Sequence, residues 1–546
     1  MKRVLWFAAL FLIAVLAGAL RCWPLGDTFI EGRVYFADPD CYSRMTRARM
    51  VSAGHALSIR HHDFENYPQG TTPHTTAPMD FAIVGLQRVL GVLPWFKADG
   101  ASVLHAQTLD LAGVLIGPLL GVLACVGMGL AWPRRERGDG LRVLAGVFLL
   151  AVSPIAVHGT LLGRPDHQAL LIALLAFALA AEVRLLEKPT PRSGVAAGLS
   201  WGIALWVSLY EPLILLVLVF ATLALLQRAA FRERARHLEW GVAAGVFLLS
   251  VLLDGWRLQA PDEVLRENFA RWSHSIGELQ PLNWRSGLLW QWLGWAALLI
   301  PLGLAWRARR DHAARLALGL LITVLALTLW QLRWGYFLVL VAAVSLPLAL
   351  KAVSRGWVAG LLFFVVLWPI AGAWDRQLFP DDAEQRRRFV WRREQVALRL
   401  IAEHQRDVAA GPFVAPWWLA PSIAYWSEQP GVTGSSHQSL PGIVDAAKIS
   451  LASTATEALP LLRRRDVAWI LADVPERIVP NAAALLGRPI PEHCLATDLY
   501  PSGELALDTA PLILERDLPH PPGEVLFHVW RVPRDPSVPS SPEPAK

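Results

Sequence analysis

The segment VLWFAALFLIAVLAGAL, residues 4 to 20, is long and apolar enough to cross a lipid bilayer as a helix. It follows Met-Lys-Arg as a signal peptide would, but the residues RCWPLG after it lack a small-x-small cleavage site. We therefore interpret it as a retained first span. Further runs of spanning length predict a polytopic α-helical membrane protein of about 11 to 13 spans. These runs are residues 109–131, 141–158, 168–186, 194–210, 212–228, 239–254, 286–306, 313–330, 334–351 and 356–374.

The composition of the 546-residue chain supports the same class. Hydrophobic residues make up 54% of the chain and the mean hydropathy is +0.38, which is too apolar for a soluble enzyme of this size. The formal net charge of +6 requires no nucleic-acid partner, because basic loops beside membrane spans explain much of the excess. The partner expected from composition is therefore a lipid bilayer and no nucleic acid.

The short loops between the spans alternate between strongly and weakly basic, and cytoplasmic loops are the basic ones. The basic loops are residues 133–140, 187–192, 227–237, 307–312 and 351–355. The outer face then holds residues 21–108, 163–168, 255–285, 331–335 and everything after 375. This assignment requires the weaker apolar stretch 79–95 to lie along the membrane interface. We expect a multi-pass protein of the cell inner (plasma) membrane whose outer side faces the periplasm.

The composition changes after residue 375, and strand and helix patterns alternate there. Such alternation predicts a mixed α/β domain outside the membrane. The pattern predicts helices at 384–409 and 442–465 and strands at 413–416 and 467–473. The expected organisation is a membrane domain at 1–375 with outer loops 21–108 and 255–285, an α/β domain at 376–532, and a disordered Pro- and Ser-rich tail at 533–546.

Several acidic residues lie on different loops of the predicted outer face. They are Asp38 and Asp40 in FADPDCYSR, Asp166 in GRPDHQ and Glu278 in SIGELQP. Carboxylates that converge repel one another unless a cation joins them, and a hard divalent ion prefers such oxygen ligands. Taken singly, each acid is equally well explained as a helix cap or an ordinary salt bridge.

Arg333 lies between two predicted spans on the same face, where a guanidinium needs an anionic partner. A phosphate-bearing substrate is one such partner, and an internal ion pair with Glu211 is the other. Cys22 and Cys41 flank the first outer loop and either pair in an oxidising compartment or remain free thiols.

Together these segments resemble the catalytic subunit of the oligosaccharyltransferases, which are GT-C membrane enzymes that transfer a lipid-linked glycan to asparagine. The family patterns DPWFNYR, YPLG, SYDNEG and SVSEHQP are similar to segments that occur here in the same order. These segments are DPDCYSR at 38–44, NYPQGTT at 66–72, GRPDHQ at 163–168 and SIGELQP at 275–281, followed by an R-x-x-x-F spacing from Arg333 to Phe337.

The resemblance implies a GT-C type membrane domain and a role for each candidate residue. It implies a divalent metal cofactor, Mg²⁺ or Mn²⁺, and a polyprenyl-pyrophosphate-linked glycan as donor. The implied residues are metal ligands Asp38, Asp166, Gln168 and Glu278, catalytic residues Asp38 and Glu278, the pyrophosphate ligand Arg333, acceptor-binding Trp417 and Trp418, and Asp40 and His167 as neighbours that support the ligands.

Two departures bear on the function. Gln168 stands where the family has an acid or histidine. In VAPWWLAPSIAYW, residues 414 to 426, both tryptophans of the family's WWD signature are kept, but Leu419 replaces its aspartate. That aspartate binds the hydroxyl of an Asn-x-Ser/Thr acceptor, and a leucine cannot accept a hydrogen bond. The sequence thus predicts a changed acceptor rule.

Three functions compete at this stage. The favoured one is metal-dependent, inverting transfer of a glycan from a polyprenyl pyrophosphate to an acceptor protein or peptide, on asparagine. The second is a GT-C enzyme whose acceptor is a lipid, a polysaccharide or a hydroxyl group, which the loss of the WWD aspartate favours. The third is a transporter without catalysis, and the placement of the acids on outer loops speaks against it.

Overall fold

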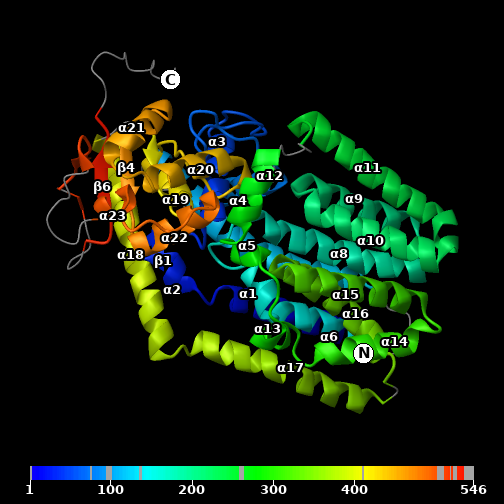
Figure 1. Ribbon diagram of the computed structural model, residues 1–546. Coiled ribbons are helices and arrows are strands. Elements are labelled where there is room, and N and C mark those ends of the chain that lie inside the picture. Colours follow the sequence, from blue (N-terminus) through cyan, green and yellow to red (C-terminus); the bar gives the residue numbers. More distant parts are fainter. Residues whose placement is uncertain are drawn as a thin grey trace.

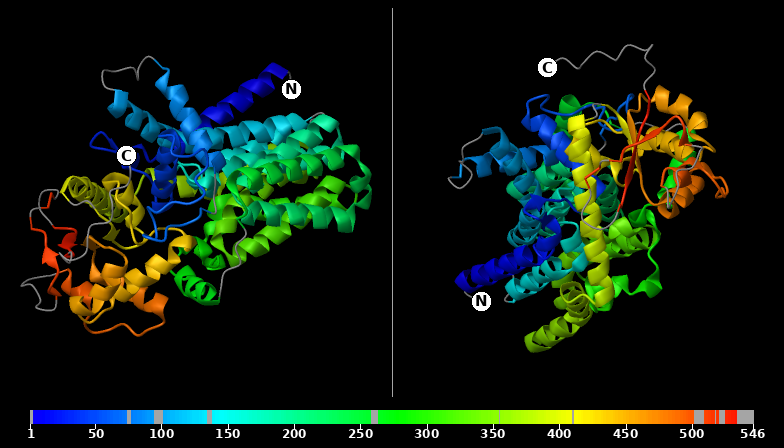
Figure 2. Two further views of the ribbon diagram at one scale, coloured as in Figure 1. Left: turned by 90° about the horizontal axis from the view of Figure 1, so that it is seen from above. Right: turned by 90° about the vertical axis from the view of Figure 1, so that its left-hand side faces the viewer.

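A computed structural model describes residues 3–73, 77–93, 101–133, 138–257, 263–353, 355–408, 411–500, 509–516, 518–519 and 525–533. It consists of a bundle of long helices beside a smaller module that contains a sheet (Figure 1). Helix α18 runs from the end of the bundle up along this module, and a view from above shows the two parts side by side (Figure 2).

Apolar runs of the sequence form the helices of the bundle. They are α1 (Arg3–Arg21), α5 (Ala101–Ala131), α6 (Asp139–Val152), α7 (Pro154–His158), α8 (His167–Glu187), α9 (Pro191–Val207), α10 (Tyr210–Leu226), α11 (Arg234–Asp254), α13 (Leu288–Leu293), α14 (Ala296–Ala308), α15 (His312–Trp330), α16 (Gly335–Leu350) and α17 (Gly356–Leu378), with the 3₁₀ turn η2 (Arg228–Arg232).

Each span predicted from the sequence falls on helix, and the predicted fold class is confirmed. Two predicted spans are broken into pairs of helices, for local reasons. At 141–158 the break comes before Pro154, which has no N–H to donate. At 286–306 the break comes at Gly294, whose φ of +59° favours glycine. A Cβ at this position would also collide with the carbonyl oxygen of Val366.

Among the described residues, seven helical stretches are long and apolar enough to cross a membrane: Arg3–Arg21, Gln107–Ala131, His167–Glu187, Arg234–Asp254, His312–Trp330, Leu332–Leu350 and Trp357–Leu378. Helices α10 and α14 are apolar but shorter. Residues 79–91 of the stretch 79–95 lie in the 15-residue helix α4, which is not among the seven, and residues 94 and 95 lie outside the described residues. The place of this stretch at the interface stays a prediction.

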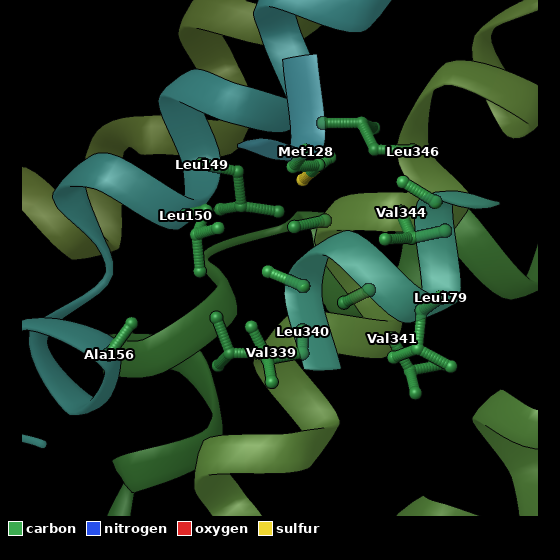
Figure 3. Close-up of a cluster of buried hydrophobic side chains, with 14 of the residues drawn as sticks. Met128, Leu149, Leu150, Ala156, Leu179, Val339, Leu340, Val341, Val344 and Leu346 are labelled. Atoms are coloured by element: carbon green, nitrogen blue, oxygen red, sulfur yellow. The ribbon is translucent and has the colours of Figure 1, made fainter. Parts of the chain in front are cut away.

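The centre of the bundle is α16, whose residues are all buried. It packs against α6, α8, α14 and α15, and its side chains interlock with Met128, Leu149 and Leu179 from neighbouring helices (Figure 3). A helix that is apolar on every side is expected at the middle of a membrane bundle. The 3₁₀ turn η5 (Leu332–Trp334) directly precedes α16. The polar site therefore lies at the N-terminal end of this central helix.

The two long outer loops carry their own short elements. The first loop holds α2 (Leu25–Thr28), the hairpin β1 (Phe29–Ile30) and β2 (Arg33–Val34), α3 (Pro39–Ser52) and α4 (Ala77–Gly91). The second holds α12 (Glu263–Ser273), η3 (Gly277–Leu279) and η4 (Trp284–Ser286).

The C-terminal module is a small α/β unit. Its elements are α18 (Asp382–Val408), β3 (Phe413–Val414), α19 (Ala420–Ser427), η6 (His437–Ser439), α20 (Leu440–Ser450), α21 (Ala455–Arg464), β4 (Trp469–Ala472), α22 (Pro475–Leu486), α23 (Leu495–Asp498), β5 (Ile513–Leu514) and β6 (His528–Arg531). The strand order is β3-β4-β6-β5, with β3 and β4 parallel and the other pairs antiparallel.

The helices and strands predicted after residue 375 are confirmed, with 442–465 forming the two helices α20 and α21. Strands β5 and β6 were not predicted. The division into domains stays a prediction, and its boundary at residue 375 falls inside α17. The predicted tail lies outside the described residues apart from Pro533. Cys22 and Cys41 are both free thiols.

Candidate functional site

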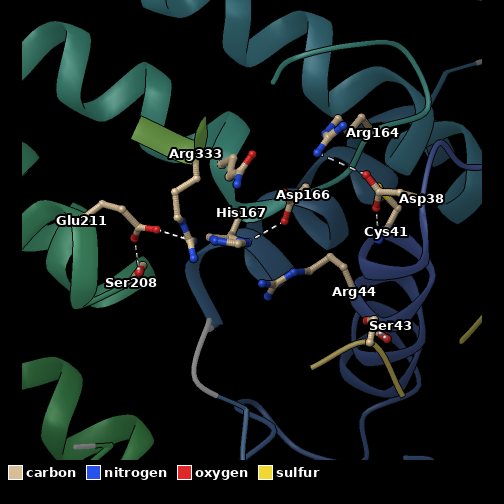
Figure 4. Close-up of polar contacts among 12 residues, drawn as sticks. Asp38, Cys41, Ser43, Arg44, Arg164, Asp166, His167, Ser208, Glu211 and Arg333 are labelled. Carbon is tan, nitrogen blue, oxygen red and sulfur yellow. Dashed lines mark hydrogen bonds and ion pairs between the residues drawn. The ribbon is translucent and has the colours of Figure 1, made fainter. Parts of the chain in front are cut away.

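Asp38 begins helix α3 and has two partners. Its Oδ1 accepts a hydrogen bond from the Cys41 N–H at 3.0 Å, as an N-cap residue does, and Pro39 occupies the first helical position. Its Oδ2 lies 3.2 Å from Nη2 of Arg164 (Figure 4). Asp38 is therefore both a helix cap and half of an ion pair, in a side chain that is still 26% exposed.

Arg164 was not identified from the sequence, although it stands in the quoted loop GRPDHQ. Its side chain is 12% exposed, and Nη1 lies 3.1 Å from Nε2 of His158. Nδ1 of His158 is in turn 2.9 Å from the Tyr336 hydroxyl. The sequence did contain a signal that could have identified Arg164. A guanidinium in a short loop between two membrane helices requires partners.

The second acidic segment places three side chains at the start of α8. Asp166 is buried, and its Oδ1 lies 2.6 Å from Nδ1 of His167. Burial alone would raise the pKa of Asp166, but His167 and then Arg164 outweigh it and lower the pKa below its ordinary value. Gln168 donates from Nε2 to Oε2 of Glu278 at 3.3 Å, while its own Oε1 is buried without a hydrogen-bond partner.

Arg333 lies between two carboxylates from different elements. Nη2 is 2.5 Å from Oε1 of Glu211 on α10, and Nη1 is 3.9 Å from Oε1 of Glu278 on η3. The ion pair between Arg333 and Glu211 is therefore present. Glu211 was one of the two partners that the sequence suggested for Arg333. Figure 4 shows His167 beside the same guanidinium, so Arg333 and Asp166 share one neighbourhood.

Asp40 stands in the first turn of α3, near the same acids. Water reaches this side chain, but the surrounding protein limits its solvation. This loss of solvation, and next the carboxylates of Asp38 and Asp166, raise the pKa of Asp40 to about 7, although Ser435 donates a hydrogen bond to it. The negative charges of Asp38, Asp166 and Glu278 therefore act on Asp40 in addition to its loss of solvation.

The described residues contain no group of three or more His, Cys, Asp or Glu side chains close enough together to hold a metal ion. The expected direct convergence of Asp38, Asp166 and Glu278 is therefore not seen. Each carboxylate is instead next to a cationic or polar partner, respectively Arg164, His167 and the pair Arg333 and Gln168. The ligand-free chain satisfies its acids with its own side chains.

Trp417 and Trp418 form a turn after β3, with their rings edge to face at a centroid distance of 5.5 Å. They line a cavity of about 60 Å³ between the sheet and helices α20 and α22. The other lining residues are mainly aliphatic: Val414, Ala415, Pro416, Ile443, Ala446, Ala447, Ile449, Ile470, Leu471, Ala472, Ile478, Ala482, Leu485, Ala496 and Leu499, together with Thr433, Ser450 and Asn481.

Leu419 does not line this cavity but packs against the cluster that includes Ile423 and Tyr425. The aliphatic wall expected from Leu419 is therefore supplied by other residues. The polar side chains of the lining are already engaged. Thr433 donates to the Ala415 carbonyl at 2.7 Å, Ser450 to that of Ala446 at 2.9 Å, and Asn481 accepts from Trp417 at 3.5 Å.

The C-terminal module also contributes directly to the site through residues 431–439. Glu65 of the first outer loop is buried and accepts hydrogen bonds from Ser43, Ser436 and Ser439. His437 of the same segment faces Arg333, and burial together with that guanidinium lowers the pKa of His437 to about 4. A serine-rich turn carries little sequence signal, so this docking was not predicted.

No family model matches the chain, and no curated protein matches it in sequence. Solved structures do match in three dimensions. One is archaeal oligosaccharyltransferase AglB from Archaeoglobus fulgidus in complex with an inhibitory peptide and a dolichol-phosphate. It is 15% identical, with a TM-score of 0.66 over 89% of this chain and 71% of that chain. The chain has the fold of an oligosaccharyltransferase.

Two further structures of the Archaeoglobus fulgidus oligosaccharyltransferase agree. The one tethered to an acceptor peptide containing the NVT sequon has a TM-score of 0.63 at 14% identity, over 89% of this chain and 70% of that one. The complex with Zn and sulfate has a TM-score of 0.60 at 16% identity, over 88% and 70%. The likeness to an oligosaccharyltransferase thus extends over both the bundle and the C-terminal module.

The ion pair of Arg333 gives a prediction about stability. Replacing Glu211 with alanine should destabilise the protein by about 3 kcal/mol, because it leaves a mostly buried guanidinium without its nearest partner. The measurement is the midpoint of thermal unfolding in detergent micelles. The control is Glu267→Ala, which removes an exposed pair with Arg271 and should cost less than about 1 kcal/mol. Equal losses in both variants would contradict the account of Arg333.

Proposed function

We propose that this protein is a metal-dependent, inverting glycosyltransferase of the oligosaccharyltransferase type. It transfers a glycan from a polyprenyl-pyrophosphate carrier to an acceptor protein or peptide, with asparagine as the acceptor residue. The observation that carries the proposal is the shared neighbourhood of Arg333, Asp166 and Glu278 at one end of the bundle, under a C-terminal module with the same overall fold as the archaeal enzyme.

Unused hydrogen-bond donors support an anionic donor substrate. Arg333 and Arg164 each have a buried Nε–H without an acceptor among the described residues. A pyrophosphate presents several anionic oxygens, and charge-assisted hydrogen bonds to such oxygens are strong. Arg333 would bind this group and stabilise the negative charge that develops on it as the bond to the sugar breaks.

The residues of the site fit a divalent metal ion. The unpartnered Oε1 of Gln168 is an oxygen available to a metal beside Glu278, and the carboxylates of Asp38 and Asp166 lie near Asp40. Asp38, Asp166, Gln168 and Glu278 would hold Mg²⁺ or Mn²⁺. A bound metal supplies Lewis-acid stabilisation of the leaving pyrophosphate. The archaeal structure with Zn and sulfate supports a metal and an anion in this fold.

The protein side chains would contribute mainly by positioning. Asp38 and Glu278 would hold the acceptor nitrogen opposite the pyrophosphate on the anomeric carbon, which inverts that carbon. Arg164, which pairs with Asp38 and has an unused Nε–H, would bind a phosphate oxygen of the donor. Asp40 and His167 would keep the ligand carboxylates charged and oriented. The bond to the carrier breaks as the bond to the acceptor forms.

We place the reaction on the periplasmic face of the cell inner membrane, because the basic loops 227–237 and 307–312 mark the opposite, cytoplasmic end. In this arrangement residues 1–375 form the catalytic membrane domain and residues 376–532 the periplasmic acceptor-binding domain. The carrier lipid would reach the site from the bilayer, and the acceptor from the periplasm.

A second function is kept because of one observation. The cavity lined by Trp417 and Trp418 is mainly aliphatic, and the hydroxyls of Thr433 and Ser450 already donate to backbone carbonyls. Such a cavity is poorly suited to the hydroxyl of an Asn-x-Ser/Thr acceptor. The alternative is a GT-C transfer of the same polyprenyl-linked sugar to a lipid, a polysaccharide or a hydroxyl group.

Mass spectrometry of periplasmic glycopeptides and of membrane glycolipids, with and without the gene, separates these functions. We expect asparagine-linked glycopeptides to disappear and the lipid-linked glycan to accumulate when the gene is deleted. Loss of a glycolipid or a polysaccharide with unchanged glycopeptides would favour the second function. Unchanged levels of every glycoconjugate would refute both.

The carboxylates give a second prediction. Asp166→Ala and Glu278→Ala should each reduce transfer by about a hundredfold or more, because losing one charged ligand weakens a hard-metal site. EDTA should abolish transfer by the wild type, and added Mn²⁺ should restore it. Asp381→Ala is the control, since this acid is exposed and its carboxylate caps the start of α18. Full activity of Glu278→Ala, or of the wild type in EDTA, would overturn the metal assignment.

The acceptor cavity gives a third prediction. Peptides that differ only two places after the asparagine should show little preference for Thr over Ala, because a hydroxyl buried without a partner costs about 1 to 3 kcal/mol. Rates with the native lipid donor and fluorescent peptides measure this preference. A hundredfold advantage of Thr would show that a polar group has replaced the missing aspartate. Asp473, whose carboxylate contacts Trp418, would then be the first to test.

A further inference from the structure

We propose that Trp272 is a positioning residue that links the acceptor cavity to Glu278. The inference deepens the proposed function and rests on it. Trp272 lies at the end of α12, six residues before Glu278 on the same outer loop. Sequence patterns gave it no role, because one tryptophan among the 25 of a membrane protein is not distinctive.

The side chain of Trp272 leaves its own loop and is buried in the C-terminal module. It is 3% exposed and packs with Leu440, Ile443 and Leu485. Its ring meets that of Trp417 edge to face, at a centroid distance of 5.4 Å and an interplanar angle of 77°. Such aromatic pairs contribute about 0.5 to 1.5 kcal/mol beyond the area they bury.

The cluster around Trp272 is also the wall of the acceptor cavity. Ile443, Ala447, Ala482 and Leu485 belong to that cluster and line the cavity as well. Protein interiors are close-packed, so a side chain that enters the cavity presses on residues that Trp272 touches from the other side. Trp272 is thus in contact with the same wall that an acceptor would contact.

A hydrogen-bonded turn joins Trp272 to Glu278. Ser275 donates to the Trp272 carbonyl from its backbone N–H at 2.9 Å and from its hydroxyl at 2.7 Å. Gln280 donates from its side chain to the Ser273 carbonyl at 2.9 Å. The turn therefore spans only a few residues and is cross-linked along its length.

The other end of this turn is fixed beside Arg333. The Gln280 carbonyl accepts a hydrogen bond from the Leu332 N–H at 2.9 Å. Glu278 is thus held between two anchors, Trp272 in the C-terminal module and Leu332 in the membrane bundle. Removing the first anchor leaves this loop held by Leu332 and leaves Glu278 with its contacts to Gln168 and Arg333. A displacement of about 1 Å in a reacting group can lower a rate by about a hundredfold.

The kinetic test compares three variants of the full-length enzyme in detergent or nanodiscs. Trp272→Ala should lower kcat by about tenfold or more and leave the KM for the lipid donor within about twofold, because Arg333 and its contact with Glu211 are untouched. Trp272→Phe should restore most of kcat, since a ring can still meet Trp417. Trp284→Ala is the matched control and should change neither constant, because Trp284 is also six residues from Glu278 but 72% exposed.

A second readout needs no activity. Hydrogen exchange of the backbone amides of residues 275–282 should become faster in Trp272→Ala and stay unchanged in Trp284→Ala. Exchange and kcat that are both unaffected in folded Trp272→Ala would overturn the role of Trp272. If the wild type transfers no glycan at all, the proposed function fails, while the exchange result still decides whether Trp272 holds the loop. Should Trp272→Ala not fold, Trp272→Leu takes its place in both measurements.

Discussion

The guanidinium of Arg333 lies between the carboxylates of Glu211 and Glu278, at the end of the helix that forms the centre of the bundle. A charge at the end of membrane helices needs a counter-charge nearby, because neither lipid nor the apolar core can solvate it. Three elements that are distant in sequence must therefore meet at this point: α10, the turn before α16, and the second outer loop. The rest of the site follows from that meeting, since the same loop carries Glu278 toward Gln168 and Asp166.

Each acid of the site lies beside a cationic or polar side chain of the protein. Asp38 has Arg164, Asp166 has His167, and Glu278 has Gln168 with Arg333 more distant. These pairs stabilise carboxylates that would otherwise repel one another, but guanidinium groups are also suited to bind phosphate oxygens. In the proposed function, the phosphate oxygens of the donor would become partners of the guanidinium groups. A divalent cation would become the partner of the carboxylates.

The C-terminal module completes the site by hydrogen bonds and packing. Glu65 accepts from serines of both parts, Arg465 of the module contacts the first outer loop, and α19 packs on α3. Helix α3 begins at Asp38, so the module supports the helix that presents this acid. Trp272 adds a connection in the opposite direction, from the second outer loop into the module.

Much of this fold was predictable from the sequence. Long apolar runs predict the helices because the transfer energy into lipid is local to each segment, and basic loops predict their orientation in the same way. The acids of the outer loops were found because charges beside a membrane are unusual. Their partners were not, because pairing of Asp38 with Arg164 depends on how loops 36–44 and 163–168 meet in space. Leu419 shows the same limit. The sequence shows that its side chain cannot accept a hydrogen bond, but it does not show that this side chain lies outside the lining of the cavity.

The most direct test of the central claim is anomalous diffraction from crystals of the protein grown with Mn²⁺ and a polyprenyl pyrophosphate. We expect one manganese peak within bonding distance of oxygens of Asp38, Asp166, Gln168 and Glu278, with Arg164 in contact with a phosphate oxygen. A structure with the pyrophosphate bound and no peak among these four residues would contradict the account.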